Sequence, residues 1–203
     1  MPTNLYLRII AGELGGRHIQ SPGKGNSIRP MLDRVKEGLF DILARRLPKA
    51  RVLDLCAGTG SLGLEALSRG AESVLFVESQ RANVKVIHEN IAELNVGERS
   101  VVVAGELPYA LGRVKGAFDI IFFDPPFKSD LIDKTLPRLV ANGMLKKGGV
   151  LVIQRDRRSR EIKAKGFVVH RRHRIGDSEL WFFHSTAGLK EKEKPAARTG
   201  DDE

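Results

Sequence analysis

The chain has 203 residues, of which 41% are hydrophobic and 29% are charged, and this is enough for one soluble globular domain with small additions. No apolar run approaches the roughly 20 residues of a membrane span, so we expect no membrane partner. Cys56 is the only cysteine, so we expect no disulfide. Since the first residues also lack the pattern of a secretory leader, we expect a cytoplasmic location. The net charge of the whole chain is +9, and residues 1–185 alone carry +10, from 30 basic and 20 acidic residues. This excess favours binding to a polyanion, with solubility alone as the alternative.

The N-terminal part of the chain predicts a strand, a loop and a helix. Residues 5–11 are apolar and β-branched enough for a strand, and residues 12–30 are rich in glycine and proline, as loops are. From Leu32 to Leu47, apolar residues recur with the spacing of an amphipathic helix, which Pro48 ends. Long loops in compact domains tend to be functional, so we treat residues 1–30 as a separate N-terminal strand and basic loop.

Beyond Pro48, apolar strands alternate with helical patterns. Strands are predicted at 51–56, 73–78, 100–104, 118–123 and 149–153. Helices are predicted at 61–69, 80–94 and 129–142, with a weaker pattern at 106–113. Continuous apolar strands separated by helices predict a parallel sheet that is covered on both faces. We therefore expect an α/β domain over residues 31–185.

The end of the chain differs from this alternation. Residues 167–175 and 179–185 flank Gly176-Asp177 and predict a hairpin, so the mostly parallel sheet is expected to finish with an antiparallel strand. Residues 186–203 are polar, charged and contain proline and glycine, and they predict a disordered tail.

The stretch 51–63, RVLDLCAGTGSLG, predicts a buried strand, a tight glycine turn and the start of a helix. Gly58, Gly60 and Gly63 fit the pattern G-x-G-x-x-G, in which glycine lets a nucleotide cofactor lie against bare backbone. Glu78 ends the next strand, where an acid is well placed to accept hydrogen bonds from ribose hydroxyls. NAD and S-adenosylmethionine fit this feature alike, because both contain adenosine.

Further acidic residues favour S-adenosylmethionine. Asp54 precedes the glycine turn on its strand, and Glu106 follows the third strand. Surplus negative charge suits a cofactor with a sulfonium and an ammonium group, and it suits a pyrophosphate poorly. The alternative is that these carboxylates cap loops or the first turn of a helix.

The fourth strand runs directly into Asp124-Pro125-Pro126-Phe127. Ligands of open α/β sheets bind beyond the carboxyl ends of the strands, which is where this tetrapeptide falls. Its prolines fix the backbone and remove two N–H donors, which leaves a ledge rich in acceptors beside a flat aromatic ring. This ledge suits the exocyclic amino group of a nucleobase, with Phe127 stacked on the base and catalysis by positioning and charge stabilisation. A rigid loop with a core phenylalanine is the alternative.

The glycine turn and the Asp-Pro-Pro-Phe motif together resemble class I S-adenosylmethionine-dependent methyltransferases that methylate amino groups. Residues 9–17 (IIAGELGGR), 28–43 (IRPMLDRVKEGLFDIL) and 172–183 (RHRIGDSELWFF) resemble the bacterial 16S rRNA guanine-N2 methyltransferases of the RsmD type. The resemblance covers about residues 5–185. It implies a Rossmann-like fold with a mostly parallel seven-stranded sheet, S-adenosylmethionine as methyl donor, and methylation of the guanine conventionally numbered 966 in the small-subunit rRNA.

The resemblance also implies roles for individual residues. Asp124, Pro125, Pro126 and Phe127 would hold the target base and form the catalytic site. Cofactor binding would fall to Asp54, Gly58, Thr59, Gly60, Glu78, Ser79, Glu106, Leu107 and Arg34. Within that set, Asp54 and the glycines would hold the methionine part, Glu78 the ribose, and Glu106 with Leu107 the adenine. Glu106 stands where Asp is usual in the family, and Phe127 replaces a frequent Tyr.

Basic residues cluster between 155 and 174, where nine of them face only two acids. We interpret part of this cluster, with basic residues from the N-terminal loop and the Asp-Pro-Pro-Phe loop, as phosphate contacts for RNA. The predicted nucleic-acid contacts are Arg17, Lys24, Arg29, Lys128, Arg155, Arg157 and Arg158. A solvated surface is the alternative, and Trp181 is expected in the core rather than stacked on a base. No histidine or acidic cluster suggests a metal site.

Four functions remain open at this point. The first is an rRNA guanine-N2 methyltransferase that acts as a monomer on 16S rRNA in assembly intermediates of the small subunit. The second is a DNA adenine-N6 methyltransferase, but 203 residues leave no room for a separate target-recognition domain. The third is an NAD-dependent oxidoreductase, for which no proton-transfer residue stands out. A non-catalytic RNA-binding assembly factor would not require Asp124.

Overall fold

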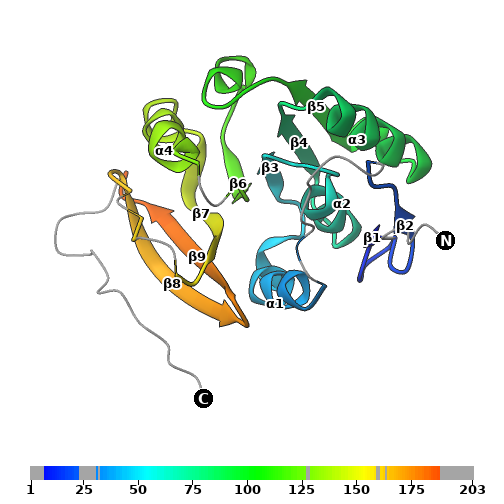
Figure 1. Ribbon diagram of the computed structural model, residues 1–203, viewed down its shortest axis with the longest axis horizontal. Coiled ribbons are helices and arrows are strands. Elements are labelled where there is room, and N and C mark those ends of the chain that lie inside the picture. Colours follow the sequence, from blue (N-terminus) through cyan, green and yellow to red (C-terminus); the bar gives the residue numbers. More distant parts are fainter. Residues whose placement is uncertain are drawn as a thin grey trace.

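The computed structural model describes residues 7–22, 31, 33–126, 129–158, 161–162 and 164–187. These residues form a seven-stranded sheet with the order β5-β4-β3-β6-β7-β9-β8 (Figure 1). Five neighbouring strands are parallel: β5 (Ser100–Ala104), β4 (Ser73–Glu78), β3 (Arg51–Leu55), β6 (Phe118–Phe123) and β7 (Leu145–Asp156). The predicted Rossmann-like architecture is confirmed, and the strand order reverses between β3 and β6, where open α/β sheets bind their ligands.

Helices cover both faces of this sheet, because the strands are apolar on both sides. On one face, α1 (Asp33–Leu43), α2 (Ser61–Ser68) and α3 (Arg81–Glu93) contribute to one hydrophobic cluster. On the other face, the 3-10 helix η3 (Tyr109–Arg113) and α4 (Leu131–Ala141) contribute to a second cluster. The predicted helices are confirmed. The weak pattern at 106–113 forms only the 3-10 helix η3. Helix α1 is followed by a short 3-10 turn, η1 (Ala44–Arg46). A further 3-10 turn, η2 (Gly97–Arg99), precedes β5.

The C-terminal hairpin is confirmed. Strand β8 (Phe167–Ile175) and strand β9 (Ser178–Ser185) are antiparallel, and Gly176 takes a positive φ of 61° in the turn between them. The chain places β9 against β7, also antiparallel, and leaves β8 at the edge of the sheet. Trp181 is buried, as expected, and the Arg172 guanidinium lies 3.7 Å from the centre of its ring. Within the described ranges, no helix is both long and apolar enough to cross a bilayer.

The N-terminal segment corrects a prediction. Instead of one strand over 5–11 followed by a loop, the described residues form a short antiparallel ribbon of β1 (Leu7–Arg8) and β2 (His18–Ile19). The turn between them uses Gly12 and Gly16, both with positive φ. Strands of two residues have no repeating pattern of their own, so their pairing depends on this turn and on packing. The ribbon lies beside α2 (Figure 1).

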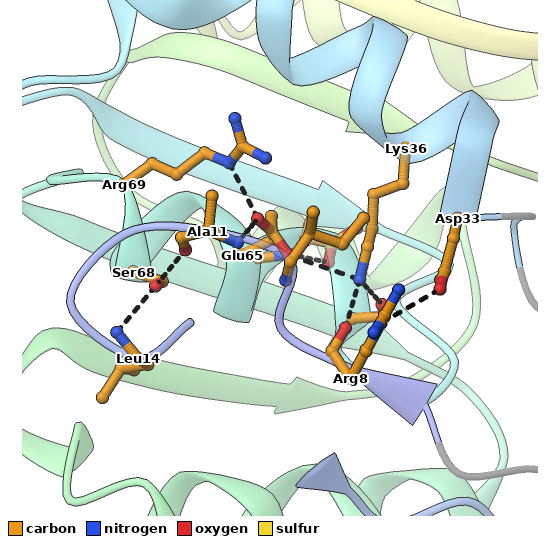
Figure 2. A network of polar contacts seen from close by, with 12 residues as sticks. Arg8, Ala11, Leu14, Asp33, Lys36, Glu65, Ser68 and Arg69 are labelled. Atoms are coloured by element: carbon orange, nitrogen blue, oxygen red, sulfur yellow. Dashed lines mark hydrogen bonds and ion pairs between the residues drawn. The ribbon is translucent and has the colours of Figure 1, made fainter. Parts of the chain in front are cut away.

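A buried ionic network attaches this ribbon to the sheet domain (Figure 2). Glu65 of α2 is fully buried, and its carboxylate accepts the backbone N–H groups of Ile10 at 2.7 Å and Ala11 at 3.1 Å. The same carboxylate pairs with Arg69 at 2.7 Å and with the buried Lys36 of α1 at 3.3 Å. Four positive or donor groups therefore converge on one carboxylate, which compensates for the cost of burying it.

Lys36 continues the network toward the glycine turn. Its Nζ donates to the Arg8 carbonyl at 2.7 Å and to Ser61 Oγ at 3.2 Å (Figure 2). Burial lowers the pKa of Lys36, and the charge of Glu65 opposes that shift. Ser61 is the first residue of α2, directly after Gly60, so the network connects the N-terminal ribbon, α1 and the turn that was predicted to bind a cofactor.

Candidate active site

A cavity of about 490 Å³ opens along the carboxyl edge of the sheet. Its lining follows the strand order: Glu106 and Leu107 come after β5, Glu78 and Ser79 end β4, and Asp54 with the glycine turn comes from β3. Across the reversal point, Asp124, Pro125 and Pro126 follow β6, and Gln154 and Asp156 lie at the end of β7. Parallel strands thus bring segments that are 100 residues apart in the chain to one site.

The glycine turn has the predicted geometry. Gly58 and Gly60 have positive φ values of 57° and 79°, and Gly60 immediately precedes the first helical residue of α2. The Gly60 amide donates to the Ala57 carbonyl at 2.7 Å, which closes the turn. Gly58 and Thr59 line the cavity, whereas Gly60 lies behind its wall and acts by shaping the backbone.

Glu78 and Asp54 hold the turn and face the cavity at once. One Glu78 oxygen accepts the Gly58 amide at 2.8 Å, and the other accepts the amides of Ser79 and Gln80 at 2.9 and 2.8 Å. Asp54 accepts the Gly63 amide of α2 at 3.0 Å. Each carboxylate oxygen has two lone pairs, so loop capping and ligand binding are compatible for the same residue.

The carboxylates in this cavity are electrostatically unfavourable without a cation. Burial raises the pKa of Asp54 from 3.8 to about 7; the Gly63 amide opposes that shift, and the charges of Asp124 and Glu78 add to it. Burial likewise raises the pKa of Asp124 to about 7. A positively charged ligand would stabilise the ionised forms, because opposite charge favours ionisation.

The described part of the Asp-Pro-Pro-Phe motif, residues 124–126, lies at the cavity. Asp124 directly follows β6 and is partly buried, with Pro125 and Pro126 beside it in the cavity wall. The Pro126 carbonyl accepts the amide and the hydroxyl of Ser129 at 3.0 and 2.7 Å, so this acceptor is occupied within the chain. Asp124 therefore carries most of the accepting capacity of the ledge.

Other predicted residues fall outside the cavity wall or outside the described residues. Arg34 is exposed and does not line the cavity; Lys36, two positions later, contacts Ser61 directly after the glycine turn. Arg17 donates to the Glu93 carbonyl at 2.7 Å, at the C-terminal end of α3. The cavity meets the N-terminal end of that 13-residue helix, roughly 20 Å away. Lys24, Arg29, Phe127 and Lys128 lie outside the described residues.

The basic residues after β7 lie at the rim of the cavity. Arg157 and Arg158 both approach the Asp177 carboxylate, at 3.2 and 3.9 Å, and Asp177 is part of the cavity wall. Burial lowers the pKa of Arg155, and the charge of Asp133 opposes that shift. The structure therefore brings Arg157 and Arg158 to the site.

The sequence-based reasoning missed the far end of the cavity. Gln154, Asp156, Asp177 and Ser178 form this end, where β7 finishes and the antiparallel β9 begins. One signal was present: Gln154 follows an apolar strand in the same way as Glu78 and Asp124 do. Cys56 also lines the cavity, but burial and the nearby acids raise the pKa of its thiol to about 12, so it is not a nucleophile at neutral pH.

Comparison with known proteins gives a consistent result. A sequence profile of the family described as "Conserved hypothetical protein 95" matches residues 7–184. The ribosomal RNA small subunit methyltransferase D of Escherichia coli (strain K12) is 36% identical over 150 residues, which cover 74% of this chain and 75% of that protein. The protein of the same name from Buchnera aphidicola subsp. Acyrthosiphon pisum is 30% identical over 169 residues, covering 83% and 88%. A solved structure, a putative methyltransferase yhhF from Escherichia coli, aligns with a TM-score of 0.77 and 32% identity over 89% of this chain and 98% of that one.

Proposed function

The chain belongs to the Conserved hypothetical protein 95 family, that of the ribosomal RNA small subunit methyltransferases D, and from this premise we propose that it methylates the exocyclic N2 of a guanine in 16S rRNA, with S-adenosylmethionine as donor. It is an rRNA methyltransferase by family. The family resemblance suggests guanine 966. The observation that carries the proposal is the position of Asp124 in the same cavity as Asp54 and Glu78.

The chemistry of the cavity fits the proposed cofactor. Bound S-adenosylmethionine supplies an electrophilic methyl group on a sulfonium. Asp54 and the Gly58–Gly60 turn would hold its charged amino-acid part, Glu78 its ribose, and Glu106 with Leu107 its adenine. Asp54 and Asp124, whose pKa values are raised by burial, suit a cationic ligand, whereas the phosphates of NAD would add to the negative charge.

Asp124 would act on the methyl-accepting base. An aryl amine is a poor nucleophile, because its lone pair is delocalised into the ring. By accepting an N–H of the amino group, Asp124 holds the nitrogen as it becomes pyramidal and stabilises the positive charge that develops on it. The nitrogen sheds one proton when it gains the methyl group. A carboxylate with a pKa near 7 is matched to receive that proton.

The partner we propose is 16S rRNA within assembly intermediates of the small subunit, bound by a monomer in the cytoplasm. The net charge of +9 and the arginines at the cavity rim, Arg157 and Arg158, support an RNA partner. We propose further that residues 31–185 form the methyltransferase domain, that residues 1–30 are a separate N-terminal segment with a basic loop, and that residues 186–203 are a disordered tail.

The test is to incubate the protein with labelled S-adenosylmethionine and, separately, free 16S rRNA, assembled small subunits and double-stranded DNA, and then to map the modified base. We expect label on N2 of a single guanine of 16S rRNA. Label on DNA adenine, or none on any substrate while RNA still binds, would refute the proposal in favour of a DNA methyltransferase or a non-catalytic RNA-binding factor.

A further inference from the structure

Gln154 lies beside Asp124, at the end of the cavity away from the predicted cofactor-binding residues. Phe123 of β6 pairs with Ile153 of β7, so Asp124 and Gln154, one residue further along each strand, lie at the same level of the sheet. Both residues line the same cavity. Neighbouring strands are roughly 4.8 Å apart, so one planar group can contact both side chains.

The Gln154 amide has a free acceptor. Its side chain is 8% exposed, and its Nε2 donates to Ser178 Oγ at 3.4 Å across to β9. In the part of the chain that the structure describes, no donor reaches its Oε1, which is buried. Buried acceptors are almost always satisfied in folded proteins, so this oxygen is positioned for a donor that a ligand brings.

The order of the cavity indicates which ligand that is. The residues predicted for adenine, ribose and the methionine part lie over β5, β4 and β3, and they use the cavity up to the reversal point. Asp124 and Gln154 lie beyond it, over β6 and β7. On the proposed function, the group that enters this end is the base that accepts the methyl group.

Among the RNA bases with an exocyclic amino group, guanine alone carries a ring N–H next to that group. Adenine and cytosine present a ring nitrogen that accepts hydrogen bonds at the equivalent position. With the amino group on Asp124, the neighbouring Gln154 Oε1 would meet the guanine N1–H, whereas it would face a lone pair in adenine or cytosine. A site built around a hydrogen bond rejects bases that cannot make it.

We propose that Gln154 is the residue that selects guanine, by accepting its N1–H while Asp124 accepts from the N2 amino group. This inference rests on the proposed function. Gln154 is a specificity residue, whereas Asp124 acts on the reacting nitrogen. Ser178 holds the Gln154 amide with its oxygen toward the base.

The test replaces the target guanine, once mapped, with 2-aminopurine in 16S rRNA reconstituted into small subunits. This base keeps the amino group that is methylated and lacks the N1–H. Wild-type protein is expected to lose roughly 10- to 100-fold in kcat/KM on the analogue, the range for one unsatisfied buried acceptor. The variant Gln154→Met should lose a similar factor on guanine and discriminate at least tenfold less between the two bases. Gln154→Glu, which retains an acceptor, should discriminate between the two bases more strongly than Gln154→Met.

The outcomes separate the two proposals. If the wild-type protein methylates guanine N2 but Gln154→Met keeps the full wild-type discrimination, the role of Gln154 is refuted and the proposed function stands. A wild-type protein that methylates no guanine refutes both. Equal affinity of S-adenosylmethionine for wild type and Gln154→Met, by calorimetric titration, controls for general damage to the cavity; a loss of that affinity equal to the loss of rate would contradict a base-reading role.

Discussion

Replacing Glu65 with alanine should destabilise the protein more than any surface substitution, because this one carboxylate attaches the N-terminal ribbon to the sheet domain. It accepts the amides of Ile10 and Ala11 and pairs with Arg69 and Lys36 (Figure 2). The substitution leaves Lys36 buried without its carboxylate and removes the acceptor of two backbone amides. Removing one partner of a buried ion pair costs about 3 to 5 kcal/mol.

We therefore expect the free energy of unfolding to fall by about 3 to 5 kcal/mol in Glu65→Ala, and the melting temperature by roughly 6 to 20 °C for a domain of this size. Urea denaturation, followed by circular dichroism, measures the first quantity. The exposed pair of Lys85 and Glu89 on α3 offers a matched control, and Glu89→Ala should cost less than about 0.5 kcal/mol.

A double variant, Lys36→Met with Glu65→Leu, tests the cause. Apolar residues of similar size remove the Lys36 charge that Glu65→Ala leaves buried and unpaired, so this variant should be more stable than Glu65→Ala. If Glu65→Ala lies within 1 kcal/mol of wild type, or if the double variant is less stable than the single one, the network does not hold the ribbon as we infer.

Four further predictions concern the site and its surroundings. Burial raises the pKa values of Asp54 and Asp124 to about 7. Between about pH 4 and 7 the folded, ligand-free chain therefore binds more protons than the unfolded chain, and its free energy of unfolding should fall as the pH rises through that window. The ionisation of Asp54, which is assigned to the cofactor, should strengthen the binding of S-adenosylmethionine from about pH 5.5 to 8.5 in calorimetric titrations, and an affinity independent of pH would contradict it. A Cβ on Gly63 would lie 2.2 Å from a ring carbon of Phe76, so Gly63→Ala should lower the free energy of unfolding by about 1 to 3 kcal/mol. The control is Gly97→Ala, where no described atom lies within 4 Å of the added Cβ, and it should change the free energy of unfolding by less than about 0.5 kcal/mol. Equal effects of the two substitutions would refute the close packing at Gly63. RNA affinity should fall steeply between roughly 50 and 200 mM salt in a filter-binding assay, and a flat dependence would remove the phosphate contacts.

Strong periodic patterns account for what the sequence could predict of the fold. The apolar runs of β3, β4 and β6 are continuous because both of their faces are buried, and their order with the helices determines a parallel sheet. The β1–β2 ribbon was not predictable, because two-residue strands carry no period. The sequence analysis assigned no role to Lys36 or Glu65, although Lys36 lies four positions from Phe40 on the apolar face of α1.

Site residues could be predicted from the sequence where a short local motif combines residue types that suit one kind of ligand. Asp54 lies near the end of β3 before the glycine turn, Glu78 ends β4, and Asp124 follows β6 directly before two prolines. The fold brings all three to one cavity. Gln154 has the same position on its strand, but only the strand pairing reveals that it lies next to Asp124. Arg17 is basic and in a loop, yet the fold uses it on the Glu93 carbonyl. Charge alone does not say which side of the molecule a residue occupies.

The most direct test of the proposed chemistry measures methyl transfer from labelled S-adenosylmethionine to small-subunit rRNA by wild type and by Asp124→Ala. Asp119→Ala, at the other end of β6 where Asp119 pairs with Lys146, is the matched control. We predict that Asp124→Ala lowers the rate of guanine methylation at least 100-fold, a loss typical for one charge-stabilising group, while its affinity for the cofactor stays within about threefold of wild type and Asp119→Ala remains active. Wild-type rates in Asp124→Ala would contradict the assignment of this cavity as the site of methyl transfer.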